Sequence, residues 1–218
     1  MIQKDYWNDI SSNKEFTTPF QSKEFKKYVS VENRILDVGC GYGRTLNELY
    51  EQGYRNLAGI DFAEGMIVRG NELYPYLDLQ VQTSSKIDLP DQSVDAVILF
   101  AVLTCISNSK DQQNLVSEIC RVLKPNGILY VNDFLLNTDS RNIKRYEDYV
   151  RKHVADEVQA REYGVFEIPE GGVFRHHDEN WLNKLFVSFE EQEYGKLIFP
   201  TMNGHESNGF YYIGKKTQ

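Results

Sequence analysis

Short apolar runs alternate with helix-like patterns through the middle of the chain. Five runs between Arg34 and Phe134 have the length of a β-strand: ILDV from Ile35 to Val38, then NLAGIDF, LDLQVQT, VDAVILFAVL and ILYVNDF. The fourth run is apolar without interruption, which is typical of a strand buried on both faces of a sheet. Strands that alternate with helices pair as a mostly parallel sheet with helices on both faces. The pattern therefore predicts an α/β fold.

The segments between these runs carry apolar residues three and four positions apart, the spacing of one helix face. The last of them, from about Asp111 to Leu123, ends at KPNG, because Pro125 cannot continue a helix and Asn126-Gly127 favours a turn. The residues predicted to face the core are Leu46, Leu49 and Tyr50 in the first helix; Met66, Ile67 and Tyr74 in the second; and Leu115, Val116, Ile119, Val122 and Leu123 in the third.

Two segments fall outside the alternation. Residues 1 to about 30 form a polar arm or helix, which we expect to lie over the functional site and which has four aromatic anchors: Tyr6, Trp7, Phe16 and Phe20. The second segment, about residues 137–177, is predicted to be an insertion. Its first helix has an apolar stripe: Ile143, Tyr146, Val150 and Val154. This helix could form a lid over the site or simply pack on the domain. The helix ENWLNKLF and two strands, roughly Val187 to Leu197 and Gly209 to Gly214, complete a domain of residues 31–218.

Composition narrows the function. The 218 residues suit one α/β domain with an insertion, and the net charge of -8 repels nucleic acid and anionic lipid. No apolar segment has the length of a signal sequence or a membrane span, so the simplest expectation is a cytoplasmic protein without a membrane partner. The three cysteines, Cys40, Cys105 and Cys120, are widely spaced and suggest buried thiols, with no disulfide framework and no metal site.

A glycine-rich loop follows the first predicted strand. Gly39, Gly41 and Gly43 stand between that strand and a helix, where free backbone N–H groups and a helix N-terminus can bind an anion. Asp37 lies in the strand, where its carboxylate can bond loop amides or a cationic ligand group. Asp61 follows the loop by about twenty residues, the distance expected of an acid that binds a ribose diol. A tight turn without ligand and an Asp61 that merely caps a helix remain alternatives.

Three motifs together resemble one family. ILDVGCGYGRTL, GIDFAEGMI and LKPNGILYVNDF resemble motifs of the class I S-adenosylmethionine-dependent methyltransferases, in particular the type 11, UbiE-like group that acts on small molecules. The resemblance covers about Arg34 to Phe134. It implies a Rossmann-like sheet of seven strands whose last strand is antiparallel, with the ligand at the carboxyl ends of the first strands.

The resemblance also implies a binding site for S-adenosylmethionine, whose product is S-adenosylhomocysteine. The glycines and Cys40 would surround the methionine part beside Asp37, and Asp61 would bind the ribose. The adenine would lie between Phe62 and Met66, near Thr83, Ser84 or Ser85 and against Ile87, and Phe100 would lie near the methyl-donor end. Taken singly, Phe62 and Met66 fit a core equally well.

The acceptor is less defined by the sequence. The fourth apolar run lacks the Asn/Asp-Pro-Pro-Tyr motif and the Pro-Cys nucleophile of nucleic-acid enzymes of this class, which favours a small-molecule acceptor. Transfer from a sulfonium needs alignment more than acid or base catalysis, so catalytic residues need not be evident. The polar candidates for acceptor binding are Tyr6, Arg175, His176, His177, Asn203 and His205, with His205 also a candidate general base; solvated loop histidines are the alternative.

Three other functions stay open at this stage. A protein or RNA acceptor would keep the fold and change the substrate. An NAD-dependent oxidoreductase would need a third glycine at Arg44, where the dinucleotide fingerprint places it. A non-catalytic donor-binding protein would lack an acceptor pocket.

Overall fold

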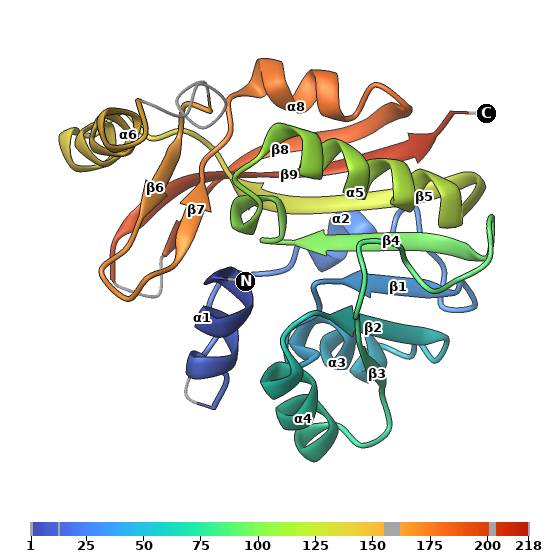
Figure 1. The fold of residues 1–218 in the computed structure, drawn as a ribbon. Coiled ribbons are helices and arrows are strands. Elements are labelled where there is room, and N and C mark those ends of the chain that lie inside the picture. Colours follow the sequence, from blue (N-terminus) through green and yellow to red (C-terminus); the bar gives the residue numbers. More distant parts are fainter. Residues whose placement is uncertain (1, 13, 155–161, 201–203, 218) are drawn as a thin grey trace.

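The computed structural model describes residues 2–12, 14–154, 162–200 and 204–217. Its centre is a seven-stranded sheet in the order β3-β2-β1-β4-β5-β9-β8 (Figure 1). The first five strands in this order pair in parallel, and β9, the last along the chain, runs antiparallel to both of its neighbours. The predicted α/β sheet is confirmed. The strands are β1 (Ile35–Val38), β2 (Leu57–Asp61), β3 (Asp78–Val81), β4 (Val94–Phe100), β5 (Leu123–Phe134), β8 (Phe189–Pro200) and β9 (Glu206–Lys216).

Helices cover both faces of this sheet. The helices are α1 (Ile2–Ile10), α2 (Ser22–Phe25), α3 (Arg44–Glu51), α4 (Glu64–Leu73), α5 (Ser109–Val122), α6 (Ser140–Lys152) and α8 (Glu179–Leu185), with a 3-10 turn at Leu103–Cys105. Leu36 and Val97 pack with residues of α5 and α8, whereas the adjacent Ile35 and Ala96 pack with residues of α2 and α3. Successive side chains of a strand point to opposite faces, so this alternation accounts for the continuous apolar runs.

Two predicted boundaries differ from the structure. β4 ends at Phe100 because Ala101 has a φ of +54°, and the last residue of the apolar run, Leu103, begins the 3-10 turn. β5 begins at Leu123, before KPNG, and its pairing with β4 is interrupted by an irregularity there. The turn predicted at KPNG is not separate from the strand, because residues 124–127 belong to β5, where Asn126 has a φ of +64°.

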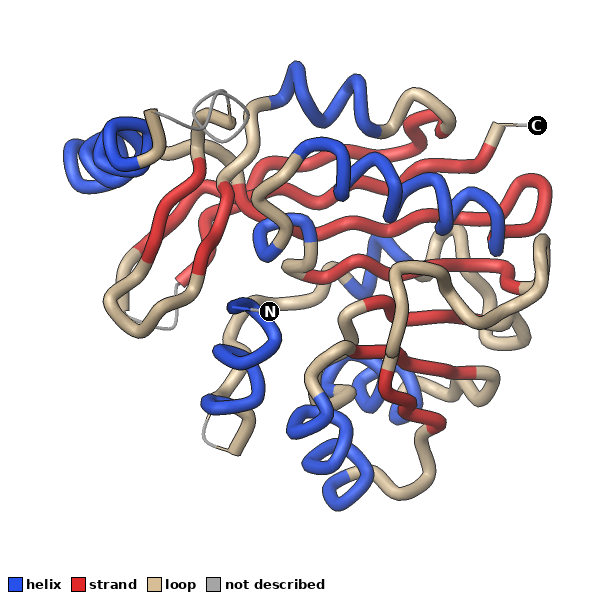
Figure 2. The backbone as a smooth tube through the Cα atoms, viewed as in Figure 1, coloured by secondary structure: helices blue, strands red, loops and turns tan. Residues whose placement is uncertain are grey.

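The insertion after β5 consists of α6 and a two-stranded hairpin, β6 (Val165–Glu167) and β7 (Val173–Arg175). Figure 2 shows both at the end of the sheet to which the parallel strands point, with the hairpin between α6 and α1. The predicted stripe of α6 is partly wrong. Tyr146 is buried, but Val154 is 72% exposed, and the inward positions are completed by Asn142 and Tyr149. Tyr146 accepts a hydrogen bond from the N–H of Asn137, and Asn142 donates one to Asp139. The spacing of apolar residues does not reveal these hydrogen bonds, so it does not predict which face of α6 is buried.

Two further expectations are met in part. None of the described helices has the length and apolarity needed to cross a membrane. Within the described residues no disulfide links the three cysteines, and Cys40 is buried whereas Cys105 and Cys120 are partly exposed.

Candidate functional site

A cavity of about 490 Å³ opens where the carboxyl ends of the parallel strands meet the arm and the insertion. The strand ends contribute Asp37 from β1, Asp61 from β2 and Phe100 from β4. The arm contributes Tyr6 and Phe16. The insertion contributes the side chains Arg141, Arg145, Phe166, Phe174 and His176. Ligands of open α/β sheets bind at this end of the strands, so the cavity lies where the topology expects a site.

The backbone of the glycine loop requires glycine at the cavity wall. Gly39 and Gly41 have φ values of +74° and +55°, which side chains other than hydrogen disfavour. A Cβ atom at Gly39 would lie 2.5 Å from Val102 Cγ2, and one at Gly41 would lie 2.6 Å from the Phe16 ring. Gly43 also has a positive φ, but it packs against Leu79 and does not line the cavity.

Asp61 is held rigidly at the end of β2. Its carboxylate accepts hydrogen bonds from the backbone N–H of Gly41 at 2.9 Å and of Ala63 at 2.8 Å. These bonds join the glycine loop to the start of α4. Because the side chain also lines the cavity, the capping role and a ligand-binding role are compatible.

Asp37 is the least satisfied acid of the cavity. It is 1% exposed, and its Oδ1 atom has no hydrogen-bond partner among the residues that the structure describes. Burial raises the pKa of Asp37 to about 7, and the neighbouring Asp61 adds to the rise. Arg44, at the start of α3, has a buried Nε atom without a partner and lies with its guanidinium 5.3 Å from the centre of the Phe100 ring. A buried polar group without a partner is costly, so this wall suits a ligand that carries both a cation and an anion.

The methionine part of S-adenosylmethionine fits these requirements. Its ammonium group can bond Asp37, and its carboxylate can bond Arg44. The free loop N–H groups expected from the sequence are not found at Gly39, Cys40, Gly41 and Gly43, whose N–H groups already donate within the protein. Among the described residues no group of His, Cys, Asp or Glu is arranged to hold a metal ion.

Aromatic side chains form the roof of the cavity. Phe16 stacks on Tyr42 with ring centres 5.1 Å apart and an angle of 2° between the planes, which brings the arm over Gly41. Tyr6 packs edge-on against Phe174 of the hairpin at 5.7 Å. The sequence indicated Phe16 only as an anchor of the arm. Its place over the glycine loop depends on a contact 25 positions away in the chain, which no local pattern signals.

His176 and His177 are buried, so the alternative of solvated loop histidines is wrong. His176 lines the cavity, and its Nδ1 atom lies 2.6 Å from the hydroxyl of Tyr146 and 3.1 Å from Nδ2 of Asn137. Because the Tyr146 oxygen accepts a bond from the N–H of Asn137, the Tyr146 hydroxyl proton points to His176. Nδ1 therefore accepts, and the ring proton lies on Nε2. Burial lowers the pKa of His176 to about 3, with the charge of His177 the next cause.

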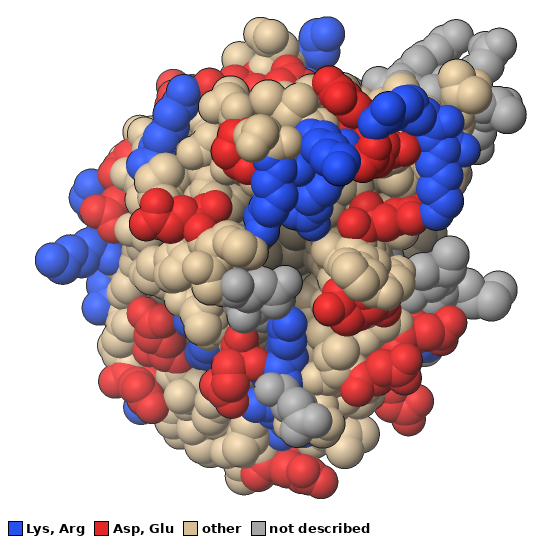
Figure 3. Space-filling model, turned by 90° about the vertical axis from the view of Figure 1, so that its left-hand side faces the viewer, with Lys and Arg blue, Asp and Glu red and all other residues tan. Residues whose placement is uncertain are grey.

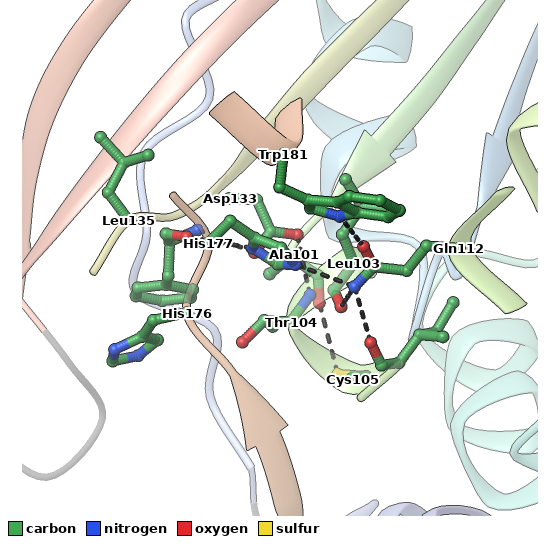
Figure 4. A network of polar contacts seen from close by, with 12 residues as sticks. Ala101, Leu103, Thr104, Cys105, Gln112, Asp133, Leu135, His176, His177 and Trp181 are labelled. Carbon is green, nitrogen blue, oxygen red and sulfur yellow. Dashed lines mark hydrogen bonds and ion pairs between the residues drawn. The ribbon is translucent and has the colours of Figure 1, made fainter. Parts of the chain in front are cut away.

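His177 belongs to a buried network behind the cavity wall (Figure 4), and Arg175 is buried with its guanidinium over Trp181 of that network. His177 lies between the Phe134 carbonyl, 3.2 Å from Nδ1, and Gln112 Nε2, 2.9 Å from its Nε2. Burial lowers its pKa to about 3. Arg175 forms an ion pair with Glu162 at 2.8 Å. Neither side chain lines the cavity, so the structure separates both of them from His176.

The other predicted site residues divide into three groups. Cys40, Phe62, Met66 and His205 line the cavity. Four residues proposed for the adenine do not line it: Thr83, Ser84 and Ser85 are exposed, and Ile87 lies in the core. Asn203 is outside the described residues. Residues that the sequence did not suggest but that line the cavity are Arg44, Arg141, Arg145, Phe134, Phe166 and Phe174.

Comparisons with known proteins identify the domain around this site. Residues 36–131 match a family model described as a methyltransferase domain. A probable S-adenosylmethionine-dependent methyltransferase of Mycolicibacterium smegmatis is 35% identical over 107 residues, which cover 49% of this chain and 38% of that protein. The ubiquinone/menaquinone biosynthesis C-methyltransferase UbiE of Campylobacter jejuni is 26% identical over 60% of this chain and 57% of its own length. The chain thus spans about half the length of these relatives.

A solved structure extends the likeness over nearly the whole chain. The S-adenosylmethionine-dependent methyltransferase of Methanosarcina mazei superposes with a TM-score of 0.79 and 26% identity, covering 92% of this chain and 99% of its own. The glycine loop, Asp37 and Asp61 lie within the residues that match the family model. Residues 36–131 therefore match a methyltransferase domain, and nearly the whole chain resembles an S-adenosylmethionine-dependent methyltransferase in its fold.

Proposed function

We propose that this protein transfers a methyl group from S-adenosylmethionine to a small-molecule acceptor. The single observation that supports the donor site most strongly is the buried Asp37 Oδ1 atom, which has no partner although it lies in the wall of the cavity. A ligand ammonium group would satisfy it. Arg44 would bind the carboxylate of the same ligand, and Asp61 would bind the ribose hydroxyls while it holds the loop.

The protein contributes mainly position and shelter to this reaction. When bound, S-adenosylmethionine supplies a methyl group on a positively charged sulfur, which bonds to a lone pair of the acceptor while the sulfur keeps the former bonding electrons. Phe16 and Tyr6 of the arm, with Phe174 of the hairpin, would exclude water from this step. Phe62 and Met66 would flank the adenine.

A small acceptor is favoured by the walls of the cavity. The arm and the hairpin meet over it through Tyr6 and Phe174, and most of the side chains there are apolar. The net charge of -8 opposes an extended nucleic-acid surface. An RNA or protein acceptor is the competing proposal, and it would need a substrate segment that enters between the arm and the hairpin.

If the acceptor loses a proton, His205 is the candidate base. It lines the cavity and is exposed, whereas His176 already presents a proton on Nε2 and has a pKa of about 3. A base that must accept a proton near neutral pH needs a pKa higher than that of His176. We therefore assign His176 to positioning and His205 to proton removal.

The donor site can be tested by thermal unfolding with S-adenosylhomocysteine and, separately, with NAD. At a concentration one hundred times the dissociation constant, a ligand stabilises the folded state by about 2.7 kcal/mol, or roughly 5–10 °C for a chain of this size. We expect a shift with S-adenosylhomocysteine alone. A shift with NAD alone, or with neither compound, would contradict the proposed donor site.

A further inference from the structure

Two arginines of α6 line the part of the cavity that the insertion forms. Arg141 and Arg145 are four residues apart, so they lie on the same side of the helix. In the described part of the chain, no ion pair neutralises either of them. Figure 3 looks onto this side of the molecule and shows Lys and Arg side chains gathered beside a hollow.

Arg145 is held in a fixed position. Its guanidinium lies over the Phe166 ring at 3.8 Å from the ring centre, and its NH1 atom donates to Asn142 Oδ1 at 3.1 Å. Within the described ranges, no hydrogen bond or ion pair uses the remaining N–H groups of this guanidinium. A planar, pre-oriented guanidinium is the group that proteins use most to bind a carboxylate through two parallel bonds.

The walls next to these arginines are aromatic and have one polar donor. Phe166 packs on His176 at 4.7 Å, and Phe134 stacks on it at 5.6 Å with 24° between the planes. The proton on His176 Nε2 can donate a hydrogen bond to a neutral oxygen or nitrogen of a ligand. Flat apolar walls with few fixed polar groups favour a planar ring system with a definite orientation.

The acidic groups of the cavity do not cancel these two charges. Glu167 is paired with Lys152 and His153, so its charge is already compensated. Glu170 acts on Tyr6 of the arm: burial is the main cause of the raised pKa of Tyr6, and the charge of Glu170 adds to it. Asp37 and Asp61 belong to the donor wall. An anion is therefore the group that would neutralise Arg141 and Arg145.

We propose that the acceptor is an aromatic carboxylic acid, whose carboxylate binds Arg141 and Arg145 and whose ring lies against Phe134, Phe166 and His176. This inference rests on the proposed function, because it assigns the acceptor half of the same cavity. The carboxylate serves as the anchor, and the methyl group goes to another atom of the acceptor. Arg141 and Arg145 then determine specificity, and His176 positions the ring.

Calorimetry with matched probes tests the proposal in the presence of saturating S-adenosylhomocysteine. The probes are benzoate, 2-naphthoate and indole-3-carboxylate, each compared with its neutral amide. The variants are R141Q and R145Q, and the control K144Q removes the same charge from an exposed residue of α6 that does not line the cavity. Because charge-assisted bonds contribute roughly 1.5–3 kcal/mol, we expect at least one acid to bind about tenfold or more tightly than its amide. R141Q and R145Q should abolish that preference, and K144Q should retain it.

Other outcomes would overturn this assignment. Equal binding of acids and amides, no binding of any acid, or an equal loss in K144Q would exclude a specific carboxylate site. Displacement of the acids by a twelve-nucleotide oligouridylate that binds more tightly would instead indicate an RNA acceptor. Failure of the donor proposal is a separate result, because S-adenosylhomocysteine would then give no thermal shift, whereas the preference for acids can also be measured without it.

Discussion

At the scale of single residues, the donor wall combines a strained backbone with an acid that lacks a partner. Gly39 and Gly41 adopt positive φ values that bring the chain close to Val102 and Phe16. Asp37 is buried with one oxygen unbonded. Both features lower the stability of the protein without ligand, and both become favourable when a charged ligand occupies the wall. Such opposition between stability and binding is common at functional sites.

The variant D37N should separate stability from binding. At pH 7.5 the buried carboxylate is largely ionised and costs free energy, so the uncharged amide should raise the free energy of unfolding without ligand by roughly 1–3 kcal/mol. The same change removes the partner of the ligand ammonium and should weaken S-adenosylhomocysteine about tenfold or more. Urea unfolding and calorimetry measure the two effects. A variant that loses stability and keeps full affinity would contradict this role of Asp37.

The variant G41A should weaken donor binding through a steric effect. An added Cβ would be strained at a φ of +55° and would press on the Phe16 ring. The control G171A has a similar strain, with a φ of +91°, but open space around the new atom. Each should lose roughly 1–3 kcal/mol of stability from the backbone strain. Only G41A should also lose affinity for S-adenosylhomocysteine, and equal affinities of the two variants would indicate that the ligand does not approach this loop.

At the scale of secondary-structure elements, Asn137 joins the insertion to the sheet. Its Nδ2 atom donates to Ser207 Oγ at 2.9 Å and lies 3.1 Å from His176 Nδ1, and its Oδ1 atom accepts from the N–H of Asn208 at 2.9 Å. One side chain thus connects the end of β5, the hairpin and β9. The insertion is therefore a fixed wall of the cavity at this junction.

Replacing Asn137 by Ala should weaken this junction. The change leaves several buried polar groups without partners, so the free energy of unfolding should fall by roughly 2–4 kcal/mol. Donor affinity should change little, because the donor wall comes from other elements. Thermal unfolding and calorimetry with S-adenosylhomocysteine check both. The control N180A, at an exposed position of α8, should stay within about 0.5 kcal/mol of the wild type; if N137A stays there too, the insertion is not held by this junction.

At the scale of the whole molecule, two buried acids and two buried histidines have opposite effects on how stability depends on pH. Burial raises the pKa of Asp37 and Asp133 from 3.8 to about 7, so their contribution to stability falls as the pH rises through this range. Burial lowers the pKa of His176 and His177 from 6.5 to about 3, so their contribution falls as the pH drops through that range. Between pH 3.8 and 6.5 the two pairs bind compensating numbers of protons.

Removing one acid should therefore change how the free energy of unfolding depends on pH. The free energy of unfolding of D37N, relative to the wild type, should increase by about 1.4 kcal/mol per pH unit between pH 4.5 and 6.5 and level off above about pH 7. Urea titrations at four pH values measure this difference, in which all unchanged groups cancel. A difference independent of pH would show that Asp37 is ionised throughout the range.

The sequence by itself determined the sheet, because each strand and helix carries its own period of apolar residues, and motif spacing alone indicated the glycine loop and its two acids. The tertiary structure decided what faces the cavity. Phe16 and Arg145 reach it through contacts with distant elements, whereas His177 and Arg175, although adjacent to His176, turn into a buried network. Local patterns report which residues avoid water, but the partner that each polar group finds depends on segments brought together only by folding.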